Sequence, residues 1–330
     1  MGARRRPPDS RRKLTPLKLT GLQFPGRRVT DVAVLLSPRL APAARASGPR
    51  LAGLLREAGC SNPVWIDSGA FHSPASAVRE AVGEGARLVL AAGGDGTVRA
   101  AAEGLWGTDA VLGILPLGTA NVLARNLGIP RRLEEAIRVA LSGRDRALDV
   151  GRTAQGLFLV AAGIGLDARM MSAFEARARH RIGLVAYVAS ALRHLGDPAF
   201  EVTVECDGGA PLHRLVAAAL VGNVARLPLG IRLRPGALVD DGSLDVVLIH
   251  PRGPVGWPRV AAALWGSPDR GAVERLPARR VEIRALAPQP MELDGDAVGW
   301  ASSLTARVHP EAITVRVPRQ PSDERLEGAR

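Results

Sequence analysis

The residues best suited to chemistry form a glycine-rich pentapeptide, Gly93-Gly94-Asp95-Gly96-Thr97. An apolar run at residues 87–92, typical of a buried strand, precedes it, and a helical pattern begins at Val98. Glycines bring backbone N–H groups close to a phosphate, and Thr97 is a favourable N-cap for the helix. Asp95 would repel a bare phosphate, which indicates contact with a metal–nucleotide complex or a ribose. The alternative is a tight glycine turn in which Asp95 serves only as a cap.

A second loop, Pro116-Leu117-Gly118-Thr119-Ala120-Asn121, follows the next apolar strand, which is expected at residues 111–115. In open parallel sheets, ligands bind beyond the carboxyl ends of the strands. Two neighbouring strands that end in small residues with hydroxyl and amide groups therefore predict a polar binding site at one edge of the sheet.

The supply of charged groups restricts the chemistry further. Of 44 basic residues, only Lys13 and Lys18 are lysine. The rest of the chain lacks the ammonium that a Walker A loop, a protein kinase strand or a Schiff base requires. A phosphate must then be held by backbone amides, arginine or a metal ion. The six histidines show no pairing or metal-ligand spacing, so a carboxylate is the expected proton acceptor.

Short apolar strands alternate with amphipathic helices between residues 30 and 150. The strands are expected at residues 31–36, 63–66, 87–92 and 111–115, and the helices at 50–57, 76–82, from 98 onward and at 120–126. Later strands at 201–206, 281–285 and 313–317 alternate apolar and polar residues, and a helical hairpin is expected at 168–195. These patterns predict an α/β domain with a parallel sheet, followed by a mainly antiparallel β domain.

The composition excludes several classes of protein. The 330 residues suffice for two domains, and aromatic residues make up only 3% of them. This is too few for base stacking, so no specific nucleic-acid partner is expected despite a net charge of +12. Cys60 and Cys206 are too few for a disulfide framework, which favours the cytoplasm. The oligomeric state is left open, with a homodimer among the alternatives.

The first 28 residues carry nine basic residues and one acid, a net charge of 9 − 1 = +8. No apolar stretch there suits a signal peptide, and no run in the chain reaches the roughly 18 residues that span a bilayer. Two interpretations of this tail stay open: a disordered, solvated extension, or a polybasic segment attracted to anionic lipid headgroups. We expect a cytoplasmic protein, either soluble or peripheral on the inner face of the membrane.

Taken together, the motifs resemble those of the diacylglycerol kinase and sphingosine kinase superfamily, in particular its bacterial-type lipid kinases. GGDGT and PLGTAN are followed in order by ARNLGIP at 124–130, DVG at 149–151, GIGLDA at 163–168, VGN at 221–223, PGALVDDGSLD at 235–245 and DGD at 294–296. The likeness spans residues 30–318, whereas GGDGT alone would also suit NAD kinases and phosphofructokinases.

The resemblance implies a nucleotide-binding α/β domain at residues 29–148 and a β-sandwich-like lipid-substrate domain at 149–304, with the active cleft between them. It also implies that the last strand, within residues 305–318, returns to the first domain. Tails would then remain at residues 1–28 and 319–330.

The same resemblance assigns functions to individual residues. It implies ATP binding by Gly93, Gly94, Asp95, Gly96, Thr97, Gly118, Thr119 and Asn121, with Ser68 as a further contact. Asp296 would be the catalytic base, at a position where the family commonly has glutamate. A structural magnesium ion would lie at Leu238, Asp241 and Ser243. Without the resemblance, Asp240-Asp241-Gly242 would be interpreted as a turn between two strands.

Several positions depart from the family pattern and indicate a divergent member. Ser37-Pro38-Arg39-Leu40-Ala41 stands where Asn-Pro-x-Ser-Gly is usual, and Arg99-Ala100 stands where Asn-Glu is common. Asp296 is one methylene shorter than glutamate, and Asp67-Ser68 lies near a position that often holds threonine.

The leading hypothesis is an ATP- and magnesium-dependent kinase that phosphorylates a hydroxyl of a diacylglycerol-like or sphingoid lipid at an anionic membrane surface. A catalytically silent member that binds nucleotide or lipid is an alternative, motivated by the departures. An NAD kinase-like enzyme is another, against which the PLGTAN, PGALVDDGSLD and DGD motifs speak.

Overall fold

The computed structural model describes residues 31–37, 41–60, 62–66, 73–165, 199–228, 231–234, 236–251, 253, 256–266, 269 and 271–319. Several expectations from the sequence lie outside these residues. They are the basic tail at 1–28, residues 38–40 of the first loop, Ser68 and the helical hairpin at 168–195.

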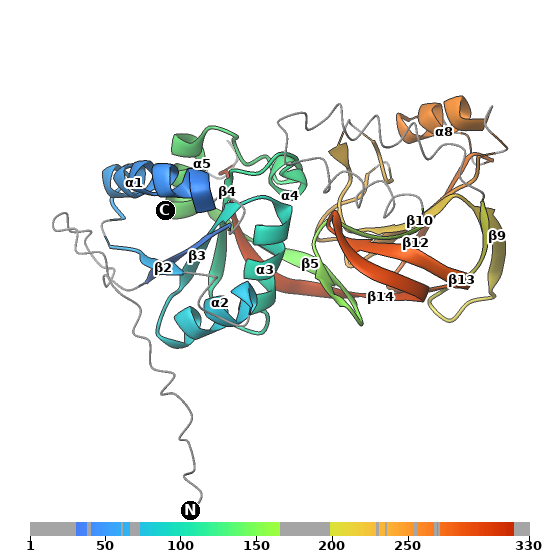
Figure 1. The fold of residues 1–330 in the computed structure, drawn as a ribbon, viewed down its shortest axis with the longest axis horizontal. Helices are drawn as coiled ribbons and strands as arrows, with labels where there is room; N and C mark the ends of the chain where they lie inside the picture. Colours follow the sequence, from blue (N-terminus) through green and yellow to red (C-terminus); the bar gives the residue numbers. More distant parts are fainter. Residues whose placement is uncertain are drawn as a thin grey trace, which may run out of the picture.

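The N-terminal half alternates strands and helices, as the apolar pattern predicts. Its elements are β1 (Val32–Leu36), α1 (Ala41–Glu57), β2 (Val64–Ile66), α2 (Pro74–Gly83), β3 (Leu88–Gly93), α3 (Asp95–Leu105) and β4 (Val111–Pro116). The four strands pair in parallel in the order β4-β3-β1-β2. Figure 1 shows α1 on one side of this sheet and α2 and α3 on the other. Such double covering explains why β3 and β4 are apolar along their length.

The C-terminal half consists mainly of antiparallel strands. Two helices, α4 (Val122–Asn126) and α5 (Leu133–Ser142), lead into β5 (Arg144–Thr153), β6 (Gly156–Phe158), β7 (Ala161–Gly165), β8 (Phe200–Cys206), β9 (Leu212–Val216), β10 (Ala218–Gly222), β11 (Leu244–Ile249), α8 (Trp257–Leu264), β12 (Val273–Ala278), β13 (Arg280–Leu293) and β14 (Asp296–Val317). The neighbours β12-β11-β10-β7-β13-β14 all pair antiparallel. The fold class predicted from the sequence is confirmed.

In the described part of the chain, strand β14 joins the two halves. The first part of β14 pairs with β13, and its last part pairs in parallel with β4, placing Thr314 opposite Val111. The strand β5 pairs antiparallel with the C-terminal half of β14, from Arg307 to Val317, so one sheet of 14 strands runs through the described part of the chain. The last strand therefore lies in the N-terminal sheet, while the sequence-based domain limits remain a prediction.

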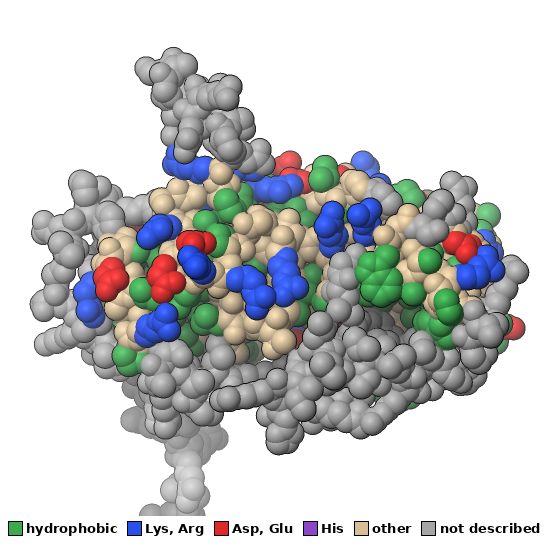
Figure 2. All heavy atoms as spheres, turned by 90° about the horizontal axis from the view of Figure 1, so that it is seen from above, with side chains coloured by type: hydrophobic (Ala, Val, Ile, Leu, Met, Phe, Trp, Pro, Cys, Tyr) green, Lys and Arg blue, Asp and Glu red, His purple; other side chains and the backbone are tan. Residues whose placement is uncertain are grey.

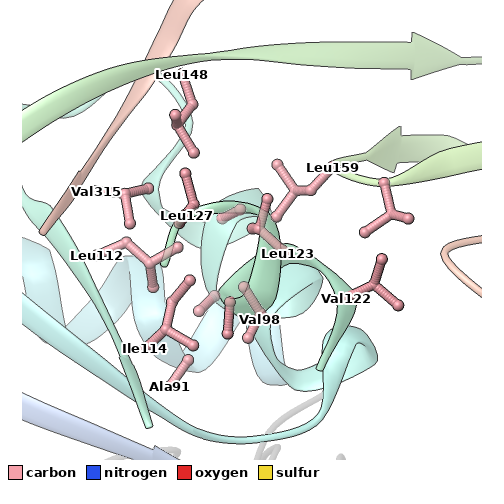
Figure 3. Packing of buried hydrophobic residues seen from close by; sticks show 14 of the residues in the cluster. Ala91, Val98, Leu112, Ile114, Val122, Leu123, Leu127, Leu148, Leu159 and Val315 are labelled. Atoms are coloured by element: carbon pink, nitrogen blue, oxygen red, sulfur yellow. The ribbon is translucent and has the colours of Figure 1, made fainter. Parts of the chain in front are cut away.

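The helices after the two glycine loops are held by the core of the N-terminal half. Val98 of α3 and Leu123 of α4 belong to the same buried hydrophobic cluster as Ile114 of β4 (Figure 3). Leu123 is 1% exposed, and burying a leucine side chain contributes about 1.5–3 kcal/mol to folding. This packing fixes the two helices, and with them the loops that precede them. Among the described helices, none is long and apolar enough to cross a bilayer.

Candidate active site

The first glycine loop turns into its helix earlier than the sequence predicts. Strand β3 ends at Gly93, and α3 begins at Asp95 with Gly94 as its N-cap. The prediction that Thr97 caps this helix is therefore wrong. Two successive glycines allow the chain to turn at once, and Asp95 lies in the first turn of the helix. Thr97 instead packs its side chain over Gly93, where a Cβ would overlap it.

The two loops touch at their backbones. A Cβ on Gly94 would lie 3.3 Å from the Cα of Gly118, and a Cβ on Gly118 would overlap Gly94. The N–H groups of Leu117 and Gly118 both donate to the carbonyl oxygen of Gly93, at 3.0 and 3.1 Å. The structure thus brings the GGDGT and PLGTAN loops together at one edge of the sheet.

Asp95 ties the first loop to the helix of the second. Its Oδ1 accepts a hydrogen bond of 3.1 Å from the backbone N–H of Leu123, in the first turn of α4. Burial raises the pKa of Asp95, and the backbone donors around it act in the opposite direction. The capping alternative considered from the sequence thus has a contact to support it, although the capped helix is α4 rather than α3.

Asn121 shapes the second loop from within. It is 4% exposed and has the left-handed backbone conformation that asparagine tolerates, with φ 48°. Its Oδ1 accepts from the N–H of Gly118 at 3.0 Å, and its Nδ2 donates to the carbonyl oxygens of Pro116 and Gly118 at 3.1 and 2.7 Å. Thr119 is exposed on the same loop. Asn121 therefore positions the loop, whereas the Thr119 hydroxyl is accessible to a ligand.

The turn between β13 and β14 brings a carboxylate to the start of α3. A Cβ on Gly96 would lie 2.8 Å from Oδ2 of Asp296. The same oxygen accepts a hydrogen bond of 2.6 Å from Nη2 of Arg99, which is 197 positions away in the chain. The Arg99 and Asp296 side chains are 20% and 27% exposed, so the pair is partly shielded from solvent. The implied base and the first glycine loop therefore meet.

Asp294, two residues earlier, is partly buried and its carboxylate accepts hydrogen bonds from the backbone. Its carboxylate accepts from the N–H groups of Leu159, Val160 and Ala161 at distances of 2.8 to 3.2 Å. Burial raises the pKa of Asp294 to about 6, against these donors and the nearby charge of Arg99. Within the DGD triplet, Asp294 thus holds the turn in place and Asp296 reaches the first glycine loop.

The turn implied as a magnesium site already contains a positive group. Arg234 donates from Nη2 to Oδ2 of Asp241 at 2.9 Å, and its Nε pairs with Asp245. The backbone N–H groups of Leu238 and Ser243 donate to the two oxygens of Asp241, at 3.4 and 3.1 Å. Mg²⁺ requires a nearly octahedral shell of oxygen ligands, and here N–H donors occupy both oxygens. As arranged, these residues do not fit a bound magnesium ion.

The neighbouring carboxylates of Asp240 and Asp149 also accept hydrogen bonds from protein N–H groups. Asp240 pairs with Arg146 through two hydrogen bonds of 2.8 and 2.7 Å. Asp149 of the DVG motif accepts from the N–H groups of Gly242 and Glu311, at 2.6 and 2.9 Å. Among the described residues, no group of three or more His, Cys, Asp or Glu side chains could hold a metal ion. The turn interpretation of residues 240–242 agrees with this network.

Sequence reasoning missed the residues that organise the site through charge. Arg99 was noted only as a departure, and Arg234 and Asp149 were given no role. The sequence could have indicated Arg99 and Arg234 only by their positions. Arg99 lies two residues after GGDGT, and Arg234 directly precedes the PGALVDDGSLD motif.

The fold and the site define a class: an α/β half whose two glycine loops meet an acidic turn from a half built mainly of antiparallel strands. The chain matches the family model of the diacylglycerol kinase catalytic domain over residues 43–153. It matches that of the YegS C-terminal NAD kinase beta sandwich-like domain over residues 160–317.

Individual relatives agree with these matches. A "Probable lipid kinase YegS-like" protein of Pseudomonas fluorescens is 33% identical over 246 residues, covering 73% of this chain and 81% of that protein. An uncharacterized protein of Synechocystis is 26% identical over 245 residues. The match covers 72% of this chain but only 56% of the Synechocystis protein, so the chain spans little more than half the length of that relative. The crystal structure of a diacylglycerol kinase from Bacillus anthracis shares the fold, with a TM-score of 0.65, 20% identity and coverage of 89% of this chain and 98% of that one.

The chain therefore belongs to the diacylglycerol kinase superfamily, together with the YegS-like proteins. This membership supports a lipid kinase.

Proposed function

We propose that this protein transfers the γ-phosphoryl group of ATP to a hydroxyl of a diacylglycerol-like or sphingoid lipid. One observation carries the proposal: the Asp296 carboxylate lies against Gly96, at the start of α3. Phosphoryl transfer requires a positioned triphosphate and a nearby group that orients the acceptor hydroxyl and takes its proton. The contact between the glycine loop and the Asp296 carboxylate supports a site in which the loop binds the triphosphate and the carboxylate receives the proton.

The triphosphate is held mainly by the backbone. The N–H groups at the start of α3, before that of Thr97, have no partner within the helix and point outward at its positive end, which attracts anions. Because Gly94, Gly96 and Gly118 lack a Cβ, the two loops and the Asp296 carboxylate approach one another closely around this helix end. The exposed Thr119 hydroxyl adds a donor at the second loop. ATP enters as its magnesium complex, in which the metal offsets part of the phosphate charge.

The lipid substrate requires access to a membrane surface. The net charge of +8 on residues 1–28 would be attracted to an anionic bilayer by about 1 kcal/mol per charge near the surface. Figure 2 shows arginine side chains over the central part of one face of the described molecule, where acidic ones are few. We propose that these charges bring the enzyme to anionic lipid.

Co-sedimentation with vesicles tests this attraction. The full chain is expected to bind vesicles that contain phosphatidylglycerol but not vesicles of phosphatidylcholine alone. Replacing the tail arginines by glutamine should weaken the binding. Equal binding to both kinds of vesicle would contradict the electrostatic proposal.

A labelled-ATP assay tests the reaction itself. The purified chain is incubated with ATP and mixed micelles of diacylglycerol or sphingosine, and in parallel with NAD. Asp296→Asn is expected to lower lipid phosphorylation by about 10²–10⁴-fold, the usual contribution of a general base. Asp240→Asn is the matched control, because Asp240 is similarly exposed and also paired with arginine. Label in NAD alone would favour the NAD kinase-like alternative, and ATP binding without any product would favour the silent one.

A further inference from the structure

Arg99 and Gly96 present one face of α3 to the same carboxylate oxygen. They are three residues apart, so their side chains project from the same side of the helix. Oδ2 of Asp296 lies 2.8 Å from the Cβ position of Gly96 and 2.6 Å from Nη2 of Arg99. The guanidinium is therefore held at the end of the helix where the phosphates of the proposed substrate would bind.

The guanidinium of Arg99 has more N–H donors than its described hydrogen bond uses. Arginine carries five N–H donors, and the described contacts include one hydrogen bond, from Nη2 to Asp296. The Nε of Arg99 is buried and has no hydrogen-bond partner among the described residues. A buried donor without an acceptor is unfavourable. The Arg99 side chain is 20% exposed, so its other N–H donors can bind an anionic oxygen that enters the site while the bond to Asp296 is kept.

Charge balance points to the same ligand. If Asp296 accepts the proton of the attacking hydroxyl, it must lie close to the phosphoryl group that is transferred. A carboxylate and a phosphate at that distance repel each other unless a cation lies between them. Besides the magnesium that accompanies ATP, Arg99 is the cation that the described contacts place beside Asp296, and the chain has no lysine after Lys18 to add another.

We propose that Arg99 binds the terminal phosphate of the nucleotide and at the same time positions Asp296 beside it. This inference rests on the proposed kinase function. It implies that Arg99 contributes to the binding of ATP but not of ADP, because ADP lacks the phosphate next to Asp296. A residue that only stabilises the fold would affect both nucleotides equally.

Calorimetric titration with ATP and ADP tests the proposal on the full chain. Arg99→Gln is expected to weaken ATP binding by at least tenfold and to leave ADP binding within about twofold, the loss expected for one charge-assisted hydrogen bond. Arg99→Lys should retain part of the preference for ATP, because the charge is kept without the planar fork. Arg214→Gln is the matched control, since Arg214 pairs with Glu274 on β12, far along the sheet.

The outcomes separate this inference from the proposed function. An Arg99→Gln variant that binds ATP as tightly as the unsubstituted chain overturns the role of Arg99. Equal weakening of ATP and ADP overturns it too, and thermal unfolding of the same variant shows whether the fold has suffered. If the unsubstituted chain phosphorylates lipid while either result is obtained, only the inference fails. If the unsubstituted chain binds no ATP, the proposed function fails and the inference with it.

Discussion

Gly94 and Gly118, which belong to two different loops, are packed backbone against backbone. A Cβ on Gly118 would overlap the Cα of Gly94 and lie 2.8 Å from Oδ1 of Asn121. A side chain at position 118 would force the loops apart, whereas a Cβ at position 94 would lie in tight contact with Gly118. The two glycine loops thus behave as one unit, whose spacing is set by the absence of side chains.

Gly118→Ala is expected to separate the loops. The added methyl group must displace the backbone of Gly94, a kind of overpacking that costs about 1–3 kcal/mol of stability. We also expect a loss of ATP affinity, because the N–H groups of the two loops no longer converge. Calorimetric titration and urea unfolding measure the two effects.

Gly53→Ala in α1 is the control, because a Cβ there meets no atom within 4 Å. This substitution should leave ATP binding unchanged and stabilise the helix by up to about 1 kcal/mol. Full ATP affinity in Gly118→Ala would show that the loops do not bind the nucleotide together.

Asp95 is expected to stabilise the fold through its oxygen rather than its charge. Its Oδ1 accepts from the N–H of Leu123, and burial raises its pKa, so the ionised form is disfavoured there. Asp95→Asn keeps the acceptor oxygen and should unfold at nearly the same urea concentration as the unsubstituted chain. Asp95→Ala removes the cap of α4 and should lose about 1 kcal/mol. Equal stability of the Asn and Ala variants would exclude the capping role.

Asp294 is expected to make stability depend on pH. Its pKa is raised from 3.8 to about 6 by burial, so the folded chain holds this proton more tightly than the unfolded chain. Between about pH 4 and pH 6 the unfolded chain has released the proton and the folded chain has not. Stability contributed by this group is therefore complete below about pH 4 and is lost as the pH rises through 6. The shift of roughly two units corresponds to about 3 kcal/mol.

Urea unfolding of the unsubstituted chain and of Asp294→Asn, at pH 4.5 and pH 7.5, measures this dependence. The asparagine keeps an oxygen that can accept from Val160 and Ala161, but it has no proton to release. The difference in unfolding free energy between the two chains should therefore shift in favour of Asp294→Asn at the higher pH. A difference that does not change with pH would show that the carboxyl is ionised throughout this range.

The architecture could largely be predicted from the sequence, because strands that are covered on both faces must be apolar along their length. This is true of β3 and β4, whose ends also carry the two glycine loops. The start of α3 could not be placed, since Thr97 is a good cap by residue type whereas the chain turns earlier, at Gly94. Residue preference is a weak guide where two glycines free the backbone.

The contacts of the acidic residues were harder to predict. The place of Asp296 beside the first loop followed from the family resemblance, and nothing in its own neighbours indicates it. Its partner Arg99 lies 197 positions away, and such a pair depends on the path of the whole chain. The turn at Asp241 was assigned to a metal on the same resemblance, while Arg234, only seven positions earlier, decides its charge environment.

Arg234 is expected to make the Asp241 turn independent of magnesium. Its guanidinium pairs with both Asp241 and the buried Asp245, whose pKa burial raises and Arg234 lowers. A positive charge is thus already present where a cation would otherwise balance the two carboxylates. Without nucleotide, the melting temperature of the full chain should be the same in excess EDTA as in millimolar magnesium. A melting temperature that rises clearly with magnesium would show that the ion displaces the arginine.

Arg234→Gln should reverse this behaviour, because it leaves two carboxylates side by side without their cation. Removing one partner from a buried pair costs about 3–5 kcal/mol, and the partial exposure of Arg234 places the expected loss at the lower end. Magnesium should then restore part of the stability, since Asp241 can turn its oxygens to the ion. Arg146→Gln, which unpairs the more exposed Asp240, should lose at most about 1 kcal/mol and gain nothing from magnesium. The contrast between the two variants distinguishes a built-in cation from an ordinary surface ion pair.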